Sequence, residues 1–227
     1  MVAGLLFSST SYGTEPSATP KTTYDIQSAF KANAEWSMSM MSTQSVLVNY
    51  LKTTQTPKIL WIGCSDSRVV PEELLKLNIG DVFTYRNIAN IVNSEDWSQM
   101  AFLEYALMHL NIDHIVVAGH VSCGGVKAAL SGTPDDVYLD GYLSPIKTIY
   151  TNNEKYFSSL KDDDERNKKL TELNVVRSVR KIAESQVYRK AIKVNSHIKI
   201  HSWIYNITDL HVNAIDYNAA EYRLLHL

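Results

Sequence analysis

Three short apolar segments constrain the fold of this chain most. They span residues 58–62, 82–85 and 114–118, and a glycine follows the first and the third, at Gly63 and Gly119. The segments are apolar throughout rather than alternating, which is typical of strands buried on both faces of a parallel sheet. Helical patterns separate them, so we predict an α/β fold with a mostly parallel β-sheet flanked by helices.

Helical signals fill the stretches between these strands. Pro71 precedes two glutamates, a pattern typical of the opening turn of a helix. Ser94 is expected to cap the next helix, whose inner side chains recur at helical spacing at Met100, Leu103, Leu107 and Leu110. Residues 142–193 are helical in composition, and we interpret their charged run at 161–166 as a solvated surface.

The two ends of the chain are predicted to differ from this body. Residues 198–205 and 210–217 predict a late strand pair. Near the start, an apolar stripe predicts an N-terminal helical arm and comprises Ile26, Ala29, Phe30, Trp36 and Met40. Residues 1–23 are rich in Ser, Thr, Gly and Pro and predict a flexible tail, so we assign residues 24–227 to a single domain.

The composition of the 227 residues excludes several classes of protein. Lys and Arg number 22 against 24 Asp and Glu, so the net charge of −2 argues against a nucleic-acid partner bound through a broad basic face. The apolar stretches are too short to cross a bilayer, so no membrane partner is expected. With only Cys64 and Cys123, a disulfide scaffold is excluded and a cytoplasmic, reducing compartment is the default.

The first twelve residues carry no recognisable targeting signal. Their brief apolar run, residues 2–7, has no basic residue before it, and the first lysine is Lys21. A secretory signal needs a positive start and a longer apolar core, and a mitochondrial presequence needs arginines. If this start is the remnant of a longer precursor, a mitochondrial or other compartment stays open.

Both cysteines follow a strand that ends in glycine. Cys64 comes directly after Gly63; His120 comes after Gly119, with Cys123 three residues further on. Sites are built beyond the carboxyl ends of parallel strands, so these side chains meet if the two strands are neighbours. Two thiolates and an imidazole suit Zn²⁺ and leave a fourth position for water. Isolated cysteines are more often small buried hydrophobes, so the trio alone leaves both interpretations open.

A carboxylate and a guanidinium follow the first cysteine closely. Residues two apart in an extended segment face the same way, so Asp66 and Arg68 can form an ion pair. Two thiolates cancel the formal charge of a zinc ion and leave its water less acidic, so such a metal needs a nearby proton acceptor. The alternative is a surface salt bridge of little consequence.

Three segments together make the chain resemble the β-class carbonic anhydrases, zinc enzymes that interconvert CO2 and bicarbonate. The segments are Cys64-Ser65-Asp66-Ser67-Arg68, Arg86-Asn87-Ile88-Ala89-Asn90 and Gly119-His120-Val121-Ser122-Cys123-Gly124-Gly125. The resemblance covers roughly residues 24–217. Residues 93–96, which follow the second segment, make the chain most similar to the fungal members of the family. Departures from the family pattern lie at Ser122, where many relatives carry Asp, at Ser202, where they commonly carry Gly, and near Leu210.

The resemblance implies a metal site and a catalytic pair. Cys64, His120 and Cys123 would hold Zn²⁺ as the cofactor. Asp66 would accept a hydrogen bond from the attacking oxygen and direct its lone pair at CO2. Arg68 would hold the Asp66 carboxylate away from the metal through a bidentate contact.

The same resemblance implies a homodimer or a higher multiple of dimers, with CO2 and bicarbonate as substrates. In the family an N-terminal helix wraps the partner and the active cleft lies at the interface. The stripe of Phe30 and Trp36 suits that role. The alternative, packing of the stripe on its own domain, stays open.

One subset of the family is inhibited by bicarbonate bound in a pocket separate from the zinc. The matching positions are Trp61, Arg86 and Tyr205. An indole N–H, a guanidinium fork and a phenol hydroxyl are all donors and suit a bicarbonate ion. The alternative is that Trp61 and Tyr205 are core residues of their strands and Arg86 caps a carbonyl.

Two further functions compete with CO2 hydration. Relatives with the same zinc site hydrolyse CS2 or carbonyl sulfide, and no motif separates these substrates. A non-catalytic zinc protein would need a fourth protein ligand, for which the other histidines are candidates: His109, His114, His197, His201, His211 and His226. His114, however, stands at the wrong end of its predicted strand, and His197 and His201 would only repeat one face of a strand.

Overall fold

The computed structural model describes residues 25–133, 135–219, 222 and 225, and the chain divides into two compact units, residues 1–53 and 54–227. The first unit holds the helices α1 (Ile26–Thr43) and α2 (Ser45–Leu51). The side chain of Asp25 caps α1 by accepting a hydrogen bond from the backbone N–H of Gln27.

The predicted helical arm is therefore present, and its apolar stripe is not covered. Neither α1 nor α2 has a buried residue, and Phe30 and Trp36 are 70% and 50% exposed. The predicted tail, residues 1–23, lies outside the described residues. The single domain over residues 24–227 stays a prediction.

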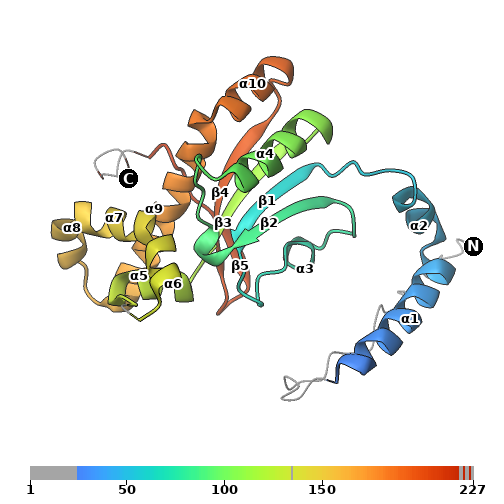
Figure 1. Ribbon diagram of the computed structural model, residues 1–227, viewed down its shortest axis with the longest axis horizontal. Helices are drawn as coiled ribbons and strands as arrows, with labels where there is room; N and C mark the ends of the chain where they lie inside the picture. The colour runs from blue at the N-terminus through green and yellow to red at the C-terminus, as the bar shows by residue number, and fades with distance from the viewer. Residues whose placement is uncertain (1–24, 134, 220–221, 223–224, 226–227) are drawn as a thin grey trace, which may run out of the picture. The chain divides into compact units, whose positions relative to one another are not determined.

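The second unit is built on a five-stranded sheet (Figure 1) with the order β2-β1-β3-β4-β5. The first four strands in this order are parallel, and β5 pairs with β4 antiparallel. The predicted mostly parallel sheet and late strand pair are thus confirmed. The strands are β1 (Ile59–Cys64), β2 (Val82–Asn87), β3 (His114–His120), β4 (Lys199–Asn206) and β5 (His211–Ala214).

Helices lie on both sides of this sheet, and Figure 1 shows α5 to α8 gathered beside one end of it. The predicted helical stretch, residues 142–193, is confirmed as a series of helices that ends with α10. The helices of the second unit are α3 (Pro71–Leu75), η1 (Ile88–Asn90), α4 (Trp97–His109), α5 (Gly124–Ser131), α6 (Val137–Tyr142), α7 (Ser144–Asn152), α8 (Glu154–Ser158), α9 (Asp163–Glu184) and α10 (Gln186–Val194).

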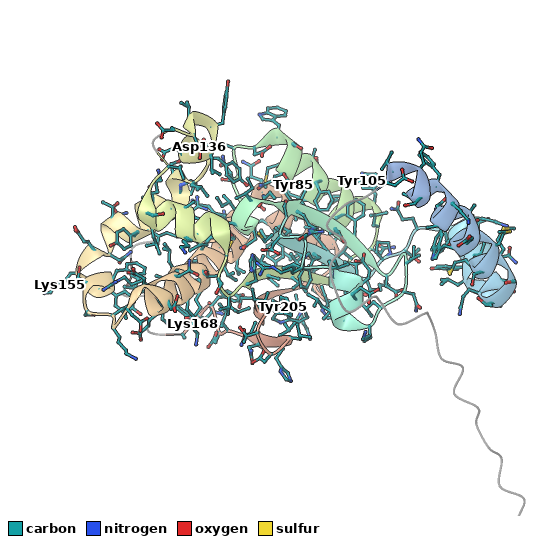
Figure 2. The ribbon with its side chains drawn as sticks, turned by 90° about the horizontal axis from the view of Figure 1, so that it is seen from below. Tyr85, Tyr105, Asp136, Lys155, Lys168 and Tyr205 are labelled. Atoms are coloured by element: carbon teal, nitrogen blue, oxygen red, sulfur yellow. The ribbon has the colours of Figure 1, made fainter. Side chains whose placement is uncertain are left out.

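The two faces of the sheet bury different side chains. On one face Leu60 and Ile62 of β1 pack in a core with residues of α4, α9 and α10. On the other face Trp61 packs with Tyr205 of β4 and with residues of α3. Figure 2 shows this separation, because Tyr85 and Tyr205 lie on opposite sides of the sheet. Burial on both faces explains why the strand sequences are apolar throughout.

One helix cap differs from the sequence prediction. Asp96, not Ser94, caps α4, because its carboxylate accepts hydrogen bonds from the N–H groups of Ser98 and Gln99. The charged run at 161–166 is a solvated surface as predicted, exposed except for the half-buried Arg166, and it also leads into α9. Its Asp162 caps the helix, and three acidic residues in the first turn suit the positive end of the helix dipole.

No helix in the described part of the chain is long and apolar enough to cross a membrane.

Candidate metal centre and active site

The carboxyl ends of β1 and β3 bring three potential ligands together. The two strands are parallel neighbours, with Gly63 opposite Ala118, and they end at Cys64 and His120. Cys123 follows His120 closely and begins α5. The two sulfurs are 3.9 Å apart, and the ligand atoms of the three residues all lie within 4.8 Å of one another. The expected meeting of these side chains at one edge of the sheet is therefore observed.

The geometry of this cluster fits a zinc ion. Zn–S bonds of about 2.3 Å at tetrahedral angles place two sulfurs roughly 3.8 Å apart, close to the observed separation. His120 Nδ1 lies 3.1 Å from the carbonyl oxygen of Val121. A carbonyl only accepts, so Nδ1 carries the proton and Nε2 keeps its lone pair. Within the described residues the buried Nε2 has no hydrogen-bond partner, as expected of a metal ligand.

The surroundings of Cys64 favour its thiolate form, which is the form that binds a cation. The Cys123 thiol lowers the pKa of Cys64 to about 4 against the opposing effect of burial, with further help from the side chain of His120 and from the backbones of Asp66 and Ala89. The same sulfur contact, together with burial, raises the pKa of Cys123. A bound cation would favour the thiolate form of both residues, because metal ligation releases the remaining proton.

The expected ion pair between Asp66 and Arg68 is present beside the ligand cluster. Arg68 Nε and Nη2 donate to the two carboxylate oxygens at 2.9 and 2.7 Å, and the Arg68 backbone N–H donates at 3.0 Å. These bonds hold the pKa of the Asp66 carboxyl well below its usual range. Asp66 Oδ2 is 3.7 Å from His120 Nε2. An ionised, oriented carboxylate therefore stands next to the three ligand atoms.

Arg86 supports this loop by binding backbone carbonyls, as the alternative to a bicarbonate pocket proposed. Its Nε donates to the carbonyl oxygen of Cys64 and its Nη2 to that of Asp66. One guanidinium thus holds the backbone on both sides of Ser65. The motif around Arg86 signalled importance, but only the fold shows which carbonyls it reaches.

The three residues proposed for a bicarbonate pocket lie in different surroundings. Trp61 and Tyr205 are buried in the same apolar cluster on the sheet face opposite Leu60. Within the described residues the Trp61 indole nitrogen has no hydrogen-bond partner. Arg86 approaches from β2, with its donors engaged by two carbonyls.

The other described histidines stand apart from the ligand cluster. His114 and His201 lie near the amino ends of β3 and β4, where Nδ1 of the first is 3.1 Å from Nε2 of the second. Burial and the neighbouring His114 lower the pKa of His201. His197 lies in the turn before β4, not on a strand as predicted, and His226 lies outside the described residues. Among the described residues, only Cys64 and Cys123 group with His120 as possible metal ligands.

Known proteins resemble this chain over most of its length. The sequence profile of the family described as carbonic anhydrase matches residues 59–212. A carbonic anhydrase of Emericella nidulans is 41% identical over 181 residues, which are 79% of this chain and 78% of that protein.

Solved structures extend the similarity to the fold. The β-carbonic anhydrase CafA of Aspergillus fumigatus has a TM-score of 0.81 at 35% identity, over 87% of this chain and 94% of its own. A tetrameric β-carbonic anhydrase of Sordaria macrospora has a TM-score of 0.79 at 34% identity, over 83% and 95%. The family match over residues 59–212 includes both strand ends that carry the candidate ligands.

Proposed function

Because this chain belongs to the β-class carbonic anhydrases, most similar to fungal members, we propose that Cys64, His120 and Cys123 hold the zinc ion of its active site. Its reaction is the reversible hydration of CO2 to bicarbonate and a proton. The observation that carries the site assignment is the buried, unpaired Nε2 of His120 beside two free thiols 3.9 Å apart. The metal would supply Lewis-acid activation of the water that attacks CO2.

Asp66 and Arg68 would orient the reacting water. The carboxylate of Asp66 stands beside the ligand atoms and would accept a hydrogen bond from the attacking water, which would fix the direction of its lone pair. Arg68 makes a two-point contact that keeps this carboxylate ionised and would hold it away from the metal. The proton released in the reaction passes to buffer.

The test is a stopped-flow assay of CO2 hydration on the zinc-loaded full chain, with CS2 and carbonyl sulfide as competing substrates. We expect rapid CO2 hydration that is lost after chelation and recovered when zinc is restored. Hydration that survives complete removal of the metal would contradict the assignment. Closure of the site by a fourth protein ligand would instead give a zinc-loaded but inactive chain.

We further propose that the chain forms a dimer or a multiple of dimers through its N-terminal arm. The support is the exposed apolar stripe of α1, because large exposed apolar patches mark interaction sites. The related enzyme of Sordaria macrospora is tetrameric. Sedimentation should give at least twice the mass of one chain. Phe30→Asp with Trp36→Asp should lower that mass, whereas Trp97→Asp, at a still more exposed aromatic of α4, should not.

The cytoplasm is the proposed compartment, because two unbridged cysteines with a ligand role require reducing conditions. Trp61, Arg86 and Tyr205 are proposed as a regulatory bicarbonate site. The support is that Arg86 already holds the carbonyls of Cys64 and Asp66. An anion that drew its guanidinium away would loosen the loop that carries the catalytic pair.

A further inference from the structure

The short loop after β2 adopts a conformation that its residues do not favour. Ala89 and Asn90 have φ values of 58° and 48°, the left-handed region that favours glycine, and both residues are buried. Consecutive residues with side chains stay in this region only where the surroundings hold them. The loop is therefore fixed by contacts from elsewhere in the fold.

This loop touches both sides of the candidate metal centre. Ala89 lies in the same buried cluster as Cys64 and Cys123. On the other side Gly125, two residues after Cys123, packs directly on the loop. A Cβ at Gly125 would lie 2.8 Å from Ile88 Cγ2 and 3.1 Å from Ala89 Cβ. A movement of Ala89 would therefore be felt by both sulfur ligands.

The contacts that hold the loop come from one buried face of α9. Asn174 Nδ2 donates to the carbonyl oxygen of Ala89 at 2.7 Å. One turn later, Ser178 Oγ donates to the carbonyl oxygen of Asn90 at 3.2 Å and accepts from the N–H of Val92 at 3.3 Å. Asn174 and Ser178 are completely buried, so water does not compete for these bonds.

The same helix is fixed against the strand that carries His120. A Cβ at Gly119 would lie 2.8 Å from Val175 Cγ2 and 3.0 Å from Thr171 Cγ2. The backbone of β3 and α9 thus approach each other as closely as a glycine allows. Helix α9 therefore connects the strand that ends in His120 with the loop that packs beside Cys64 and Cys123.

We propose that Asn174 is a positioning residue for the metal centre, because it holds the Ala89 carbonyl and so keeps the loop packed beside Cys64 and against the start of α5. Its bond holds Ala89 in the left-handed conformation in which the loop meets both segments. Without this bond Ala89 can relax and shift the packing beside both sulfur ligands. The inference rests on the zinc site proposed above.

The test compares two near-isosteric variants of buried α9 residues. Asn174→Leu removes the bond to the loop, while the control Thr171→Val removes a hydroxyl that bonds only to the carbonyl of Asn167 in its own helix. Zinc transfer from the loaded full chain to a chromophoric chelator measures the affinity. We expect Asn174→Leu to bind zinc about 10- to 100-fold more weakly, the usual cost of losing support around a ligand. Thr171→Val should match the wild type.

A spectroscopic readout separates a change at the ligands from general loosening. With cobalt in place of zinc, the thiolate-to-metal absorption should shift in Asn174→Leu and stay unchanged in Thr171→Val. Ser178→Ala should show a smaller shift in the same direction, and it serves if Asn174→Leu does not fold.

Three results would overturn the proposal. Wild-type zinc affinity and cobalt spectra in Asn174→Leu and Ser178→Ala would remove the positioning role. Equal weakening in Thr171→Val would mean that any loss of a buried polar group in α9 has the same effect. Failure of the wild type itself to bind zinc would refute the metal centre, and this inference with it.

Discussion

The loops that follow β1 and β3 both provide candidate ligands, but they differ in exposure. His120, which ends β3, and Cys123, on the loop after it, are completely buried. On the loop after β1, the Asp66 side chain is 16% exposed and that of Arg68 is 56% exposed. The buried loop is suited to hold an ion out of water, and the open loop is suited to meet a substrate that arrives from solvent. Cys64, which ends β1, is buried like His120 and Cys123 but leads directly into the exposed loop.

We expect this difference in exposure to divide the carboxyl edge of the sheet into a part that binds the metal and a part that takes part in CO2 hydration. Substitutions in the loop after β3 should change how much metal the protein holds. Beyond Cys64, substitutions in the loop after β1 should change the rate of hydration while the metal stays bound. The predictions below test this division.

The largest effect is expected for the metal content of Cys123→Ser. A neutral hydroxyl is a poor substitute for a thiolate ligand, so stoichiometric zinc should fall to trace amounts after dialysis. Elemental analysis gives the measurement, and Ser122→Ala, at the exposed neighbouring position, is the control that should keep its zinc. Stoichiometric zinc in a protein with both Cys64→Ser and Cys123→Ser would refute the ligand assignment.

Asp66→Asn should produce the opposite pattern. The amide cannot act as an anionic acceptor, so CO2 hydration should fall by about 100-fold or more, while elemental analysis still finds the full zinc content. Asp113→Asn removes a carboxylate from a surface ion pair with Lys58 and should leave the rate unchanged. Undiminished turnover in Asp66→Asn would reduce the pair with Arg68 to an ordinary surface contact.

The sequence predicted the sheet and the meeting of the candidate ligands at one edge of it because each depends on local pattern. Apolar runs identify parallel strands, and a ligand placed directly after such a run must lie at the carboxyl edge of the sheet. The pair of Asp66 and Arg68 follows from a spacing of two residues. All of these relations lie within a few positions of the chain.

Relations between distant segments could not be predicted in this way. Asn174 bonds to a carbonyl 85 residues away, and the two carbonyls bound by Arg86 are 20 and 22 residues away. One signal was available, a row of uncharged polar residues at helical spacing in a helix whose other polar residues are charged: Asn167, Thr171, Asn174 and Ser178. The cap of α4 was misplaced because Ser94 and Asp96 are both good capping residues, and only the backbone path decides between them.

Arg68→Ala should lower the rate of CO2 hydration less than Asp66→Asn does, because Asp66 itself remains. Loss of the two-point contact with Arg68 frees the carboxylate of Asp66 to approach the metal and compete with water. If Arg68 acts through Asp66, its substitution should have no further effect in an Asp66→Asn background. Additive losses in the double variant would show that Arg68 contributes independently of the carboxylate. The measurement is the rate of CO2 hydration and the zinc content of the wild type, Arg68→Ala, Asp66→Asn and the double variant.

The smallest effect concerns regulation, and it joins the two loops through Arg86. Bicarbonate bound by Trp61, Arg86 and Tyr205 would draw the guanidinium from the carbonyls of Cys64 and Asp66. The open loop would then lose its support, and Asp66 would move onto the metal. A ligand can shift this balance only by its preference for the closed state. We therefore expect high bicarbonate to inhibit more than product competition allows, and activity to fall steeply at lower pH.

Kinetics at fixed pH with increasing bicarbonate provide the measurement. Tyr205→Phe and Trp61→Phe each remove one donor from a buried ring, so both should relieve the excess inhibition. Tyr85→Phe removes a hydroxyl on the opposite face of the sheet and should not (Figure 2). Purely competitive inhibition, unchanged in the first two variants, would leave Trp61 and Tyr205 as core residues. Relief in all three variants would point to a general change in the sheet, because only the first two rings lie on the face proposed to bind the anion.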